Sequence, residues 1–214
     1  MGSSCHHSGQ VPVYIINILT RQASNPLTSH SGPATVTLRP FASDAGVIRH
    51  IAVQVTRPAA NRLVLDYELQ GDIAGVRLPS GDPVDVHAEP TDGLWRHTCM
   101  EVFVSAASPG SSADYLEFNL APSGQWAAYR FSGYRAGMTP LTGLARPTIR
   151  MRIEAEQLRL NAQVTLPAQL AAGDLRLGIS AVVEESQGSL SYWALRHAAE
   201  RPDFHHPDGF GLEI

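Results

Sequence analysis

The chain has 214 residues, enough for one domain with a well-buried core, and 43% of its residues are hydrophobic. Its 16 basic and 20 acidic residues give a net charge of −4, which argues against nucleic acid or an anionic membrane surface as a partner. It contains no lysine, which excludes Schiff-base chemistry and a phosphate-loop lysine, and no apolar run of about 18 residues that would span a membrane.

Residues 1–33 differ from the rest of the chain because they are rich in Ser, His, Asn and Gly around one apolar stretch at 11–19. No Lys or Arg precedes that stretch and no clean cleavage site follows it, so the pattern does not indicate a secretory signal. We expect a disordered leader or a mis-assigned start, then one domain over 34–214, and we favour a cytoplasmic location. Cys5 lies in this leader and Cys99 in a predicted strand, so we expect no disulfide.

Most of the domain alternates apolar and polar residues, as strands do. In chain order, the predicted strands cover residues 35–38, 48–56, 63–69, 97–104, 115–120, 125–131, 148–154, 157–164, 175–183 and 210–214. We expect a long loop over 71–93, at most one helical turn over 167–172, and a short helix over 193–201 that Pro202 ends. Short strands separated by turns predict an all-β fold, a two-sheet antiparallel sandwich with a short helix near the C-terminus.

The stretch 92–138 holds two of the three tryptophans and a high density of acidic residues. Successive side chains of a strand point to opposite faces, so Glu101 lies opposite Met100 and Val102 on its strand. On the next strand, Glu117 and Asn119 share one face. If the two strands are antiparallel neighbours, the faces that carry these three polar residues can coincide, which predicts a ligand face beside the aromatic residues.

Three segments resemble a known family: GLWRHTCMEVFV, YLEFNLAPSGQWAAYRFSGYRAGM and SYWALRHAAERPDFHHPDGFGLEI. They resemble a bacterial branch of the DOMON-like domains, which are related to the family 9 carbohydrate-binding modules. Trp95 followed by Glu101, and Tyr115-x-Glu117-Phe118-Asn119 before Pro122-Ser123-Gly124, look like the core signature of that superfamily. The resemblance covers about residues 35–214 and implies a jelly-roll type of sandwich with a ligand pocket on or beside one sheet. It implies no single ligand, because the superfamily includes sugar binders and haem binders.

A saccharide site needs flat aromatic rings for stacking, and carboxylates or amides for hydroxyl hydrogen bonds. The residues predicted to bind such a ligand are Trp95, Arg96, Glu101, Glu117, Asn119, Trp126 and Tyr129. We expect the two tryptophans to stack on the sugar, the acids and the amide to bind hydroxyls, and Arg96 to orient a carboxylate or hydroxyl. The sequence therefore predicts a non-catalytic domain that binds a small molecule, with a saccharide as the first candidate. The alternative is a structural or protein-interaction domain in which the aromatics fill the core and the acids pair with arginines.

Three further functions have candidate residues. Glu101 and Glu117 on adjacent strands could serve as the acid and base of a glycosidase. Metal ligands could come from His197, His205 and His206, but adjacent histidines of an extended segment point to opposite sides. Haem ligation, which the resemblance allows, would have to use Met100, Met138, His97 or His197. We expect neither a cofactor nor a metal.

Overall fold

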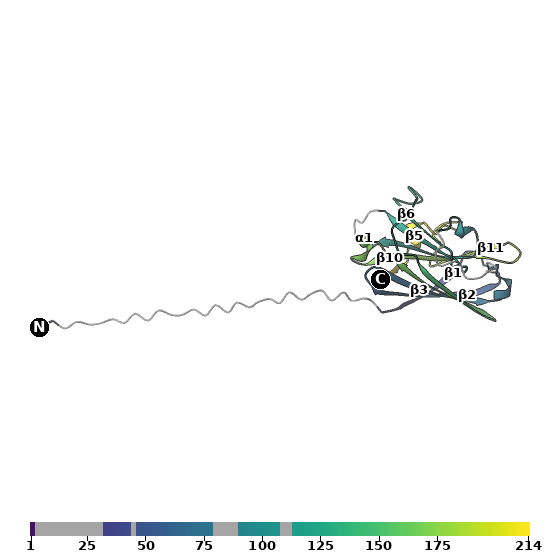
Figure 1. Cartoon of the computed structure of the whole chain (residues 1–214), viewed down its shortest axis with the longest axis horizontal. Coiled ribbons are helices and arrows are strands. Elements are labelled where there is room, and N and C mark those ends of the chain that lie inside the picture. Colours follow the sequence, from purple (N-terminus) through teal and green to yellow (C-terminus); the bar gives the residue numbers. More distant parts are fainter. Residues whose placement is uncertain (3–31, 44–45, 79–89, 108–112) are drawn as a thin grey trace.

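The structure is a computed structural model that describes residues 1–2, 32–43, 46–78, 90–107 and 113–214 (Figure 1). Its strands are β1 (Ala34–Pro40), β2 (Ile48–Ala59), β3 (Arg62–Gly71), β4 (Cys99–Ala106), β5 (Tyr115–Leu120), β6 (Trp126–Phe131), β7 (Thr139–Pro140), β8 (Thr148–Glu154), β9 (Gln157–Thr165), β10 (Leu175–Glu184), β11 (Leu190–Ala194) and β12 (Leu212–Glu213). The helical elements are α1 (Ala168–Ala171) and the 3-10 helices η1 (Ile73–Gly75), η2 (Leu94–Arg96) and η3 (Pro207–Gly209). Residues 3–31 of the predicted leader and residues 79–89 of the predicted loop over 71–93 lie outside the described residues.

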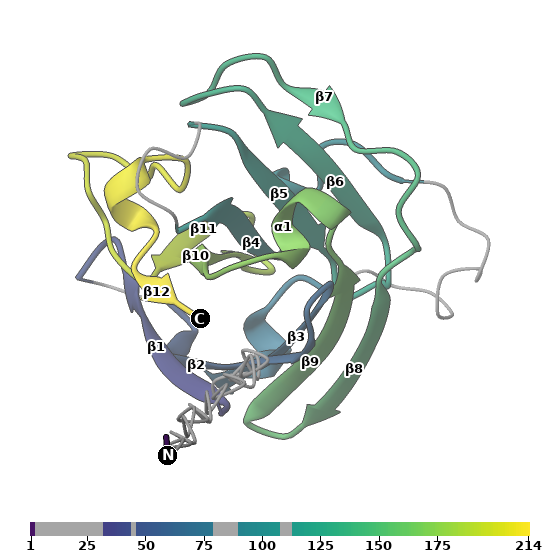
Figure 2. The same cartoon turned by 90° about the vertical axis from the view of Figure 1, so that its left-hand side faces the viewer.

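The strands pair antiparallel in one continuous path, β7-β6-β5-β4-β10-β11-β1-β2-β3-β9-β8, with β12 beside β10. β1 joins the two halves of this path, because residues 34–38 pair with β2 and residues 39–40 pair with β11. The sheet curls so that the half containing β2, β3 and β9 faces the half containing β4, β5 and β10 (Figure 1 and Figure 2). The prediction of an all-β antiparallel fold is confirmed, as one curled sheet instead of two separate ones. The jelly-roll type of connection stays a prediction.

The main core lies between the two halves of the curled sheet. On β9, Leu158, Leu160, Ala162 and Val164 are 0% exposed, as the period of two along a strand requires. The alternate apolar residues of β4 and β5 belong to the same core, which confirms the predicted faces of both strands. They are Met100, Val102, Val104, Leu116, Phe118 and Leu120. Since apolar burial stabilises a fold by about 25 cal/mol per Å² removed from water, this interior is the main source of the sheet's stability.

A second layer covers the outer face of β4, β5 and β6, the face turned away from the main core. Every residue of β5 is buried for this reason, because η2 and the segment after Pro202 pack on that face. The layer forms its own cluster of Leu94, Cys99, Phe103, Tyr115, Ala121, Ala127, Tyr129, Phe131 and Phe210. Gly178 on β10 permits the close approach, since a Cβ at that position would lie 2.9 Å from the ring of Phe210.

The helix predicted over 193–201 is wrong. Trp193 and Ala194 complete β11, which pairs with β10 on one side and with β1 on the other. Aromatic residues favour strands, and the ladder that joins the two halves of the sheet overrides the local helical tendency. The predicted turn over 167–172 corresponds to α1. No helix in the described part of the chain is long and apolar enough to cross a membrane.

Arg57 provides a test of how the end of β2 is held. Its guanidinium is buried and donates to the carbonyl oxygens of Ala60, Leu170, Ala171 and Gly173 at 2.7 to 3.3 Å. We expect Arg57→Met, which keeps much of the apolar stem and removes the donors, to lower the free energy of unfolding by about 1–3 kcal/mol. Urea denaturation at pH 7 measures it.

The matched control is Arg49→Met, which removes an exposed arginine that makes one ion pair with Glu156. Exposed ion pairs contribute about 0–1 kcal/mol, so this control should change stability little. Equal losses in the two variants would contradict a special role for the buried guanidinium.

Candidate functional site

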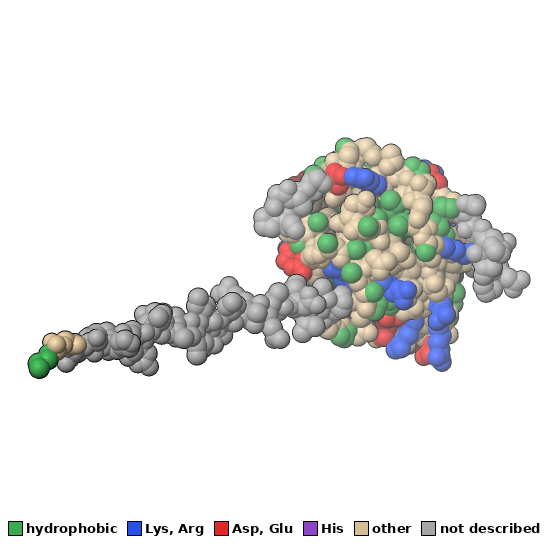
Figure 3. Space-filling view, turned by 60° about the vertical axis from the view of Figure 1, so that its left-hand side comes forward, with side chains coloured by type: hydrophobic (Ala, Val, Ile, Leu, Met, Phe, Trp, Pro, Cys, Tyr) green, Lys and Arg blue, Asp and Glu red, His purple; other side chains and the backbone are tan. Residues whose placement is uncertain are grey.

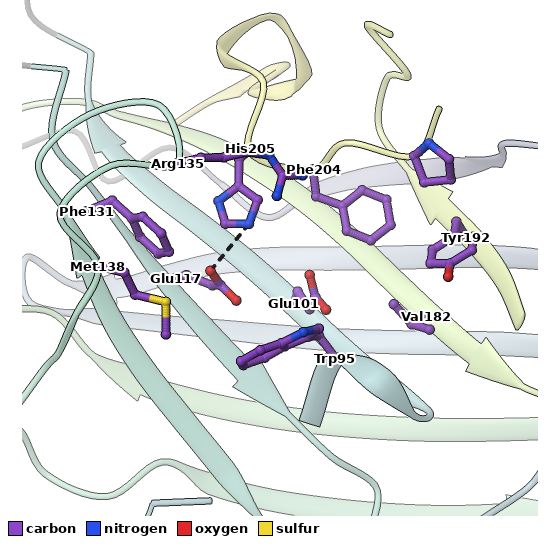
Figure 4. Close-up of a pocket in the computed structure, with 11 residues that line it drawn as sticks. Trp95, Glu101, Glu117, Phe131, Arg135, Met138, Val182, Tyr192, Phe204 and His205 are labelled. Atoms are coloured by element: carbon purple, nitrogen blue, oxygen red, sulfur yellow. Dashed lines mark ion pairs between the residues drawn. The ribbon is translucent and has the colours of Figure 1, made fainter. Parts of the chain in front are cut away.

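A cavity of about 360 Å³ lies between the outer face of the sheet and the layer that covers it (Figure 4). This volume is within the range of about 300–1,000 Å³ that small-molecule sites occupy. Its polar lining includes Glu101 from β4, Glu117 from β5, Arg135 and His205. Its aromatic lining includes Trp95 from η2, Tyr192 from β11 and Phe204. The cavity therefore combines apolar walls with a few convergent charged groups.

The two carboxyl groups reach the cavity because of the strand register. β4 and β5 are antiparallel with Glu101 opposite Asn119 and Phe103 opposite Glu117, so both acids lie on the outer face. Figure 4 shows both carboxyl groups directed into the space between Trp95 and His205. The acids are only 2% and 4% exposed. The prediction that these strand faces coincide is confirmed.

Glu101 is the less well hydrogen-bonded of the two acids. Ser180 Oγ donates to its Oε2 at 3.5 Å, whereas its buried Oε1 has no hydrogen-bond partner among the described residues. Burial, and next the charge of Glu117, raise the pKa of Glu101 well above its ordinary value, although Ser180 acts in the opposite direction. Burial therefore favours the protonated form of this carboxyl group.

Glu117 is held in place by its neighbour on β5. Asn119 Nδ2 donates to Glu117 Oε1 at 2.8 Å. Burial raises the pKa of Glu117 to about 7, against the opposing effects of Asn119 and Arg135. Asn119 itself is 0% exposed, so it orients the acid and does not line the cavity.

His205 faces Glu117 from the covering layer. Burial, and next the charge of Arg135, lower the pKa of His205 to about 4. The phenol of Tyr115 has a pKa raised to about 12, chiefly by burial, so it keeps its proton, and its hydroxyl shares a hydrogen bond of 2.8 Å with His205 Nδ1. In the tautomer in which Nδ1 accepts from the phenol, the ring proton is on Nε2, and in either tautomer Nε2 lies 3.8 Å from Glu117 Oε2. The contact marked in Figure 4 becomes an ion pair only when the imidazole is protonated and the carboxyl group is ionised.

The charge of Arg135 is balanced by Asp203. Arg135 donates from Nε and Nη2 to Asp203 Oδ1 at 3.2 and 2.8 Å, and Tyr134 donates to Oδ2. Although burial raises the pKa of Asp203, the hydrogen bonds from Tyr134 and Arg135 lower it overall. Asp203 is therefore ionised at neutral pH and pairs with this cation in the cavity wall.

Trp95 forms an aromatic wall of the cavity. Its partly buried ring meets the ring of Tyr129 edge-on, with centroids 5.9 Å apart and an interplanar angle of 76°. Tyr129 is 4% exposed and donates its hydroxyl proton to Asp92. The tyrosine therefore supports Trp95 from behind and does not itself line the cavity.

Besides Asn119 and Tyr129, two more predicted ligand residues do not line this cavity. Trp126 lies opposite Leu120 in the main core and is 7% exposed, so the expectation that it stacks on a ligand beside Trp95 is wrong. It precedes Tyr129 by three positions, and an odd separation along a strand places two side chains on opposite faces. Arg96 is exposed and does not line the cavity.

Several lining residues were absent from the predicted ligand set, among them Arg135, Met138, Tyr192 and Phe204. They reach the cavity through β11, the connection after β6 and the segment after Pro202, all of which come from outside β4 and β5. The only available signal was the presence of all four in the segments that carry the family resemblance.

The histidines proposed as metal ligands have separate partners. His197 Nε2 contacts the carbonyl oxygen of Arg39 at 2.8 Å, and His206 Nδ1 accepts from the backbone N–H of Asp208. The described residues contain no group of three His, Cys, Asp or Glu side chains arranged to hold a metal ion. Of the methionines considered for haem, Met100 is fully buried in the main core and Met138 lines the cavity. The expectation that the domain needs no cofactor stays a prediction.

Comparisons with protein-family models and with curated proteins gave no match. Among solved structures, a protein from Bacteroides uniformis that is proposed to bind carbohydrate is similar, with 14% identity, a TM-score of 0.57, and coverage of 83% of this chain and 84% of that one. Two structures of a family 9 carbohydrate-binding module from Caldicellulosiruptor kristjanssonii also align. The complex with cellotriose has 12% identity, a TM-score of 0.44 and coverage of 75% and 71%, and the complex with glucose has 11%, 0.42, 74% and 73%. The chain thus shares its all-β fold with the protein from B. uniformis, and the assignment to the DOMON-like domains stays a prediction.

Proposed function

We propose that this domain is a non-catalytic module that binds a saccharide in the cavity between Trp95 and the two buried acids. The observation that carries the proposal is the arrangement in Figure 4, in which an aromatic ring lies beside two convergent carboxyl groups. Sugars present C–H faces that stack on such rings, and hydroxyls that exchange hydrogen bonds with carboxyl groups. The shared fold with a protein proposed to bind carbohydrate supports the same function.

The proposed role of each residue follows from its position relative to the cavity. Trp95 stacks on the sugar ring, while Glu101 and Glu117 hydrogen-bond its hydroxyls. The unpartnered Oε1 of Glu101 accepts or donates a bond that a ligand supplies, which satisfies a buried polar atom. Asn119 and Tyr129 are positioning residues behind this first layer, since each contacts a neighbouring side chain and neither lines the cavity.

Glycoside hydrolysis is a second candidate function, and one observation favours it. Glu101 and Glu117 are neighbouring carboxyl groups, and the pKa of each is raised, as that of a general acid is. Against it, both acids lie almost fully buried at the base of the cavity. We expect no turnover of chromogenic glycosides, and turnover that disappears in Glu101→Gln would replace the binding proposal with an enzymatic one.

A protein-docking role has less support. On the face shown in Figure 3, apolar side chains are scattered among polar and charged ones and do not gather into one patch. Docking surfaces usually show contiguous apolar areas of several hundred Å². The cavity beside the two acids therefore favours a small ligand.

Replacing Trp95 with alanine tests the saccharide proposal. We expect the dissociation constant for a bound monosaccharide to rise at least about tenfold, because the variant loses the stacking surface. Isothermal titration calorimetry with a panel of neutral and amino hexoses measures it. The matched control is Arg96→Ala, which removes the adjacent exposed side chain and should change affinity less than about twofold. Equal affinities in the wild type and in Trp95→Ala would remove the indole from the site.

A further inference from the structure

The cavity has an excess of acidic groups over cationic ones. Glu101 approaches from β4 and Glu117 from β5, while β10 lines the cavity with Val182 and places Ser180 beside Glu101. The charged residues on the same face of β10, Arg176 and Glu184, lie outside the cavity lining and form ion pairs with Glu213 and Arg77. Arg135 is the one cation among the described lining residues, and it is already paired with Asp203. The remaining basic group, His205, has its pKa lowered to about 4, chiefly by burial. Two carboxyl groups are therefore left without a permanent counter-charge.

The unpartnered atom of Glu101 points to where a ligand group would lie. Oε1 is buried, lacks a hydrogen-bond partner among the described residues, and belongs to a carboxyl group directed into the cavity (Figure 4). Buried side-chain oxygens are rarely left without a partner, because each one costs about as much as a lost hydrogen bond. A ligand group beside this oxygen and Glu117 would satisfy it.

The apolar walls suit a cation as well as a sugar ring. Trp95 faces the two acids from one side, and Phe204 and Tyr192 lie on the other (Figure 4). An aromatic face attracts a cation through its quadrupole, most strongly when the ring is tryptophan. An ammonium group also has three N–H donors and no acceptor, which matches a pocket floor made of two carboxyl groups.

We propose that the ligand group seated on Glu101 and Glu117 is a protonated primary amine, so that the pocket takes an amino sugar in preference to a neutral one. The proposal rests on the saccharide-binding function proposed above. The ammonium supplies the counter-charge that the cavity lacks, and its N–H groups donate to both acids. The sugar ring then extends along Trp95. A neutral hydroxyl at the same place satisfies the hydrogen bonds but gives the two acids no counter-charge, so burial keeps them protonated.

Matched sugars provide the test. Isothermal titration calorimetry at pH 6.5 would compare D-glucosamine, D-galactosamine and D-mannosamine with their N-acetyl forms and parent hexoses, and with cyclohexylamine as an amine that carries no hydroxyls. We expect at least one hexosamine to bind about tenfold or more tightly than its N-acetyl form and its parent hexose. The N-acetyl form keeps the nitrogen and loses its charge, so this pair isolates the effect of the cation.

The outcomes separate this proposal from the saccharide function. Parent hexoses that bind as tightly as hexosamines would overturn the amine proposal and leave saccharide binding in place. Binding of cyclohexylamine with no binding of any sugar would overturn the saccharide function and with it the preference for amino sugars, and would leave only an amine site on the two acids. No binding by any of these compounds would overturn both.

Proton release gives a readout that does not depend on affinity. An ammonium beside Glu101 and Glu117 favours their ionised forms, so binding of a hexosamine should release protons at pH 6.5, while binding of a parent hexose should not. Titrations in two buffers with different ionisation enthalpies measure the number released. Hexosamine binding without proton release would contradict the proposed contact with the acids.

Charge-removing variants locate the effect. In Glu101→Gln and in Glu117→Gln, the ratio between the dissociation constants of the parent hexose and the hexosamine should fall from about tenfold to less than about threefold. Glu156→Gln is the matched control, because it removes an exposed carboxylate outside the cavity and should keep the full ratio. Circular dichroism confirms that each variant is folded. A ratio that survives both substitutions in folded protein would overturn the proposal, and the sugar comparison in the wild type decides it even if neither variant folds.

Discussion

Between pH 4.5 and pH 7, the wild type should lose about 3 kcal/mol more stability than the variant Glu117→Gln. Burial raises the pKa of Glu117 from 4.5 to about 7 in the folded state, so within this window the folded carboxyl group is protonated and the unfolded one is ionised. The contribution of this group is fully present below pH 4.5 and is lost as the pH rises to about 7. Glutamine has no such transition, and urea denaturation at half-unit steps of pH measures the difference.

The pKa of the buried Glu101 is also raised, so ionisation of Glu101 also lowers the stability of the wild type as the pH rises. Its pKa is raised by burial and by the charge of Glu117, and the glutamine substitution therefore also makes ionisation of Glu101 easier. The wild type should thus lose more stability than the variant as the pH rises. Parallel curves for the two proteins would show that Glu117 is ionised in the folded state well below pH 7.

His205 should give the opposite result in the same experiment. Burial lowers its pKa from 6.5 to about 4, so between these values the unfolded imidazole binds a proton that the folded one does not. Its contribution is present above pH 6.5 and is lost as the pH falls to about 4. As the pH falls from 6.5 to about 4, we expect the wild type to lose about 3 kcal/mol more stability than His205→Asn. His206→Asn, which changes the adjacent histidine outside the cavity, is the control and should leave the wild-type slope unchanged.

Because the windows of Glu117 and His205 overlap between pH 4.5 and 6.5, their opposing slopes offset each other in the wild type. His205 therefore offsets the loss of stability that comes from Glu117 across mildly acidic pH, while the loss from Glu101 remains. Both variants are needed to measure this offset. Glu117→Gln shows the pH dependence that comes from His205, and His205→Asn shows the one that comes from Glu117.

The alternation of side chains was sufficient to predict where the acids lie. Glu101 and Glu117 each follow a buried apolar residue on a short strand, and any antiparallel pairing with an even offset places them on one face. The register that the structure shows is such a pairing. Local pattern therefore predicted β4 and β5, the faces of these two strands and the polar floor of the cavity.

The layer that turns this face into a cavity could not be predicted in the same way. His205 and Phe204 reach the acids through contacts with residues about 90 to 100 positions earlier in the chain, and such contacts leave no periodic signal. The mistaken helix over 193–201 had the same origin, because pairing of β11 with β1 and β10 depends on distant strands. The error at Trp126 was of another kind, since parity along β6 already placed it opposite Tyr129.

Trp126 should therefore matter for stability and not for the ligand. It is 7% exposed in the main core, where a change to alanine leaves a cavity of indole size. We expect Trp126→Ala to lower the free energy of unfolding by about 3–5 kcal/mol, the usual cost of removing a large buried aromatic side chain. Denaturation at pH 7 measures the loss, and the folded fraction should keep its ligand affinity within about twofold.

Trp126→Phe distinguishes packing from polarity at the same position. The indole N–H is buried without a hydrogen-bond partner among the described residues, so phenylalanine keeps most of the ring contacts and removes a donor that the core does not satisfy. We expect this variant to lose much less stability than Trp126→Ala. Trp95→Ala should show the reverse behaviour, with a large loss of affinity and a small loss of stability, because its ring lines the cavity and is only partly buried. If Trp126→Ala abolished binding in folded protein while Trp95→Ala did not, the ligand would have to bind on the opposite side of β6.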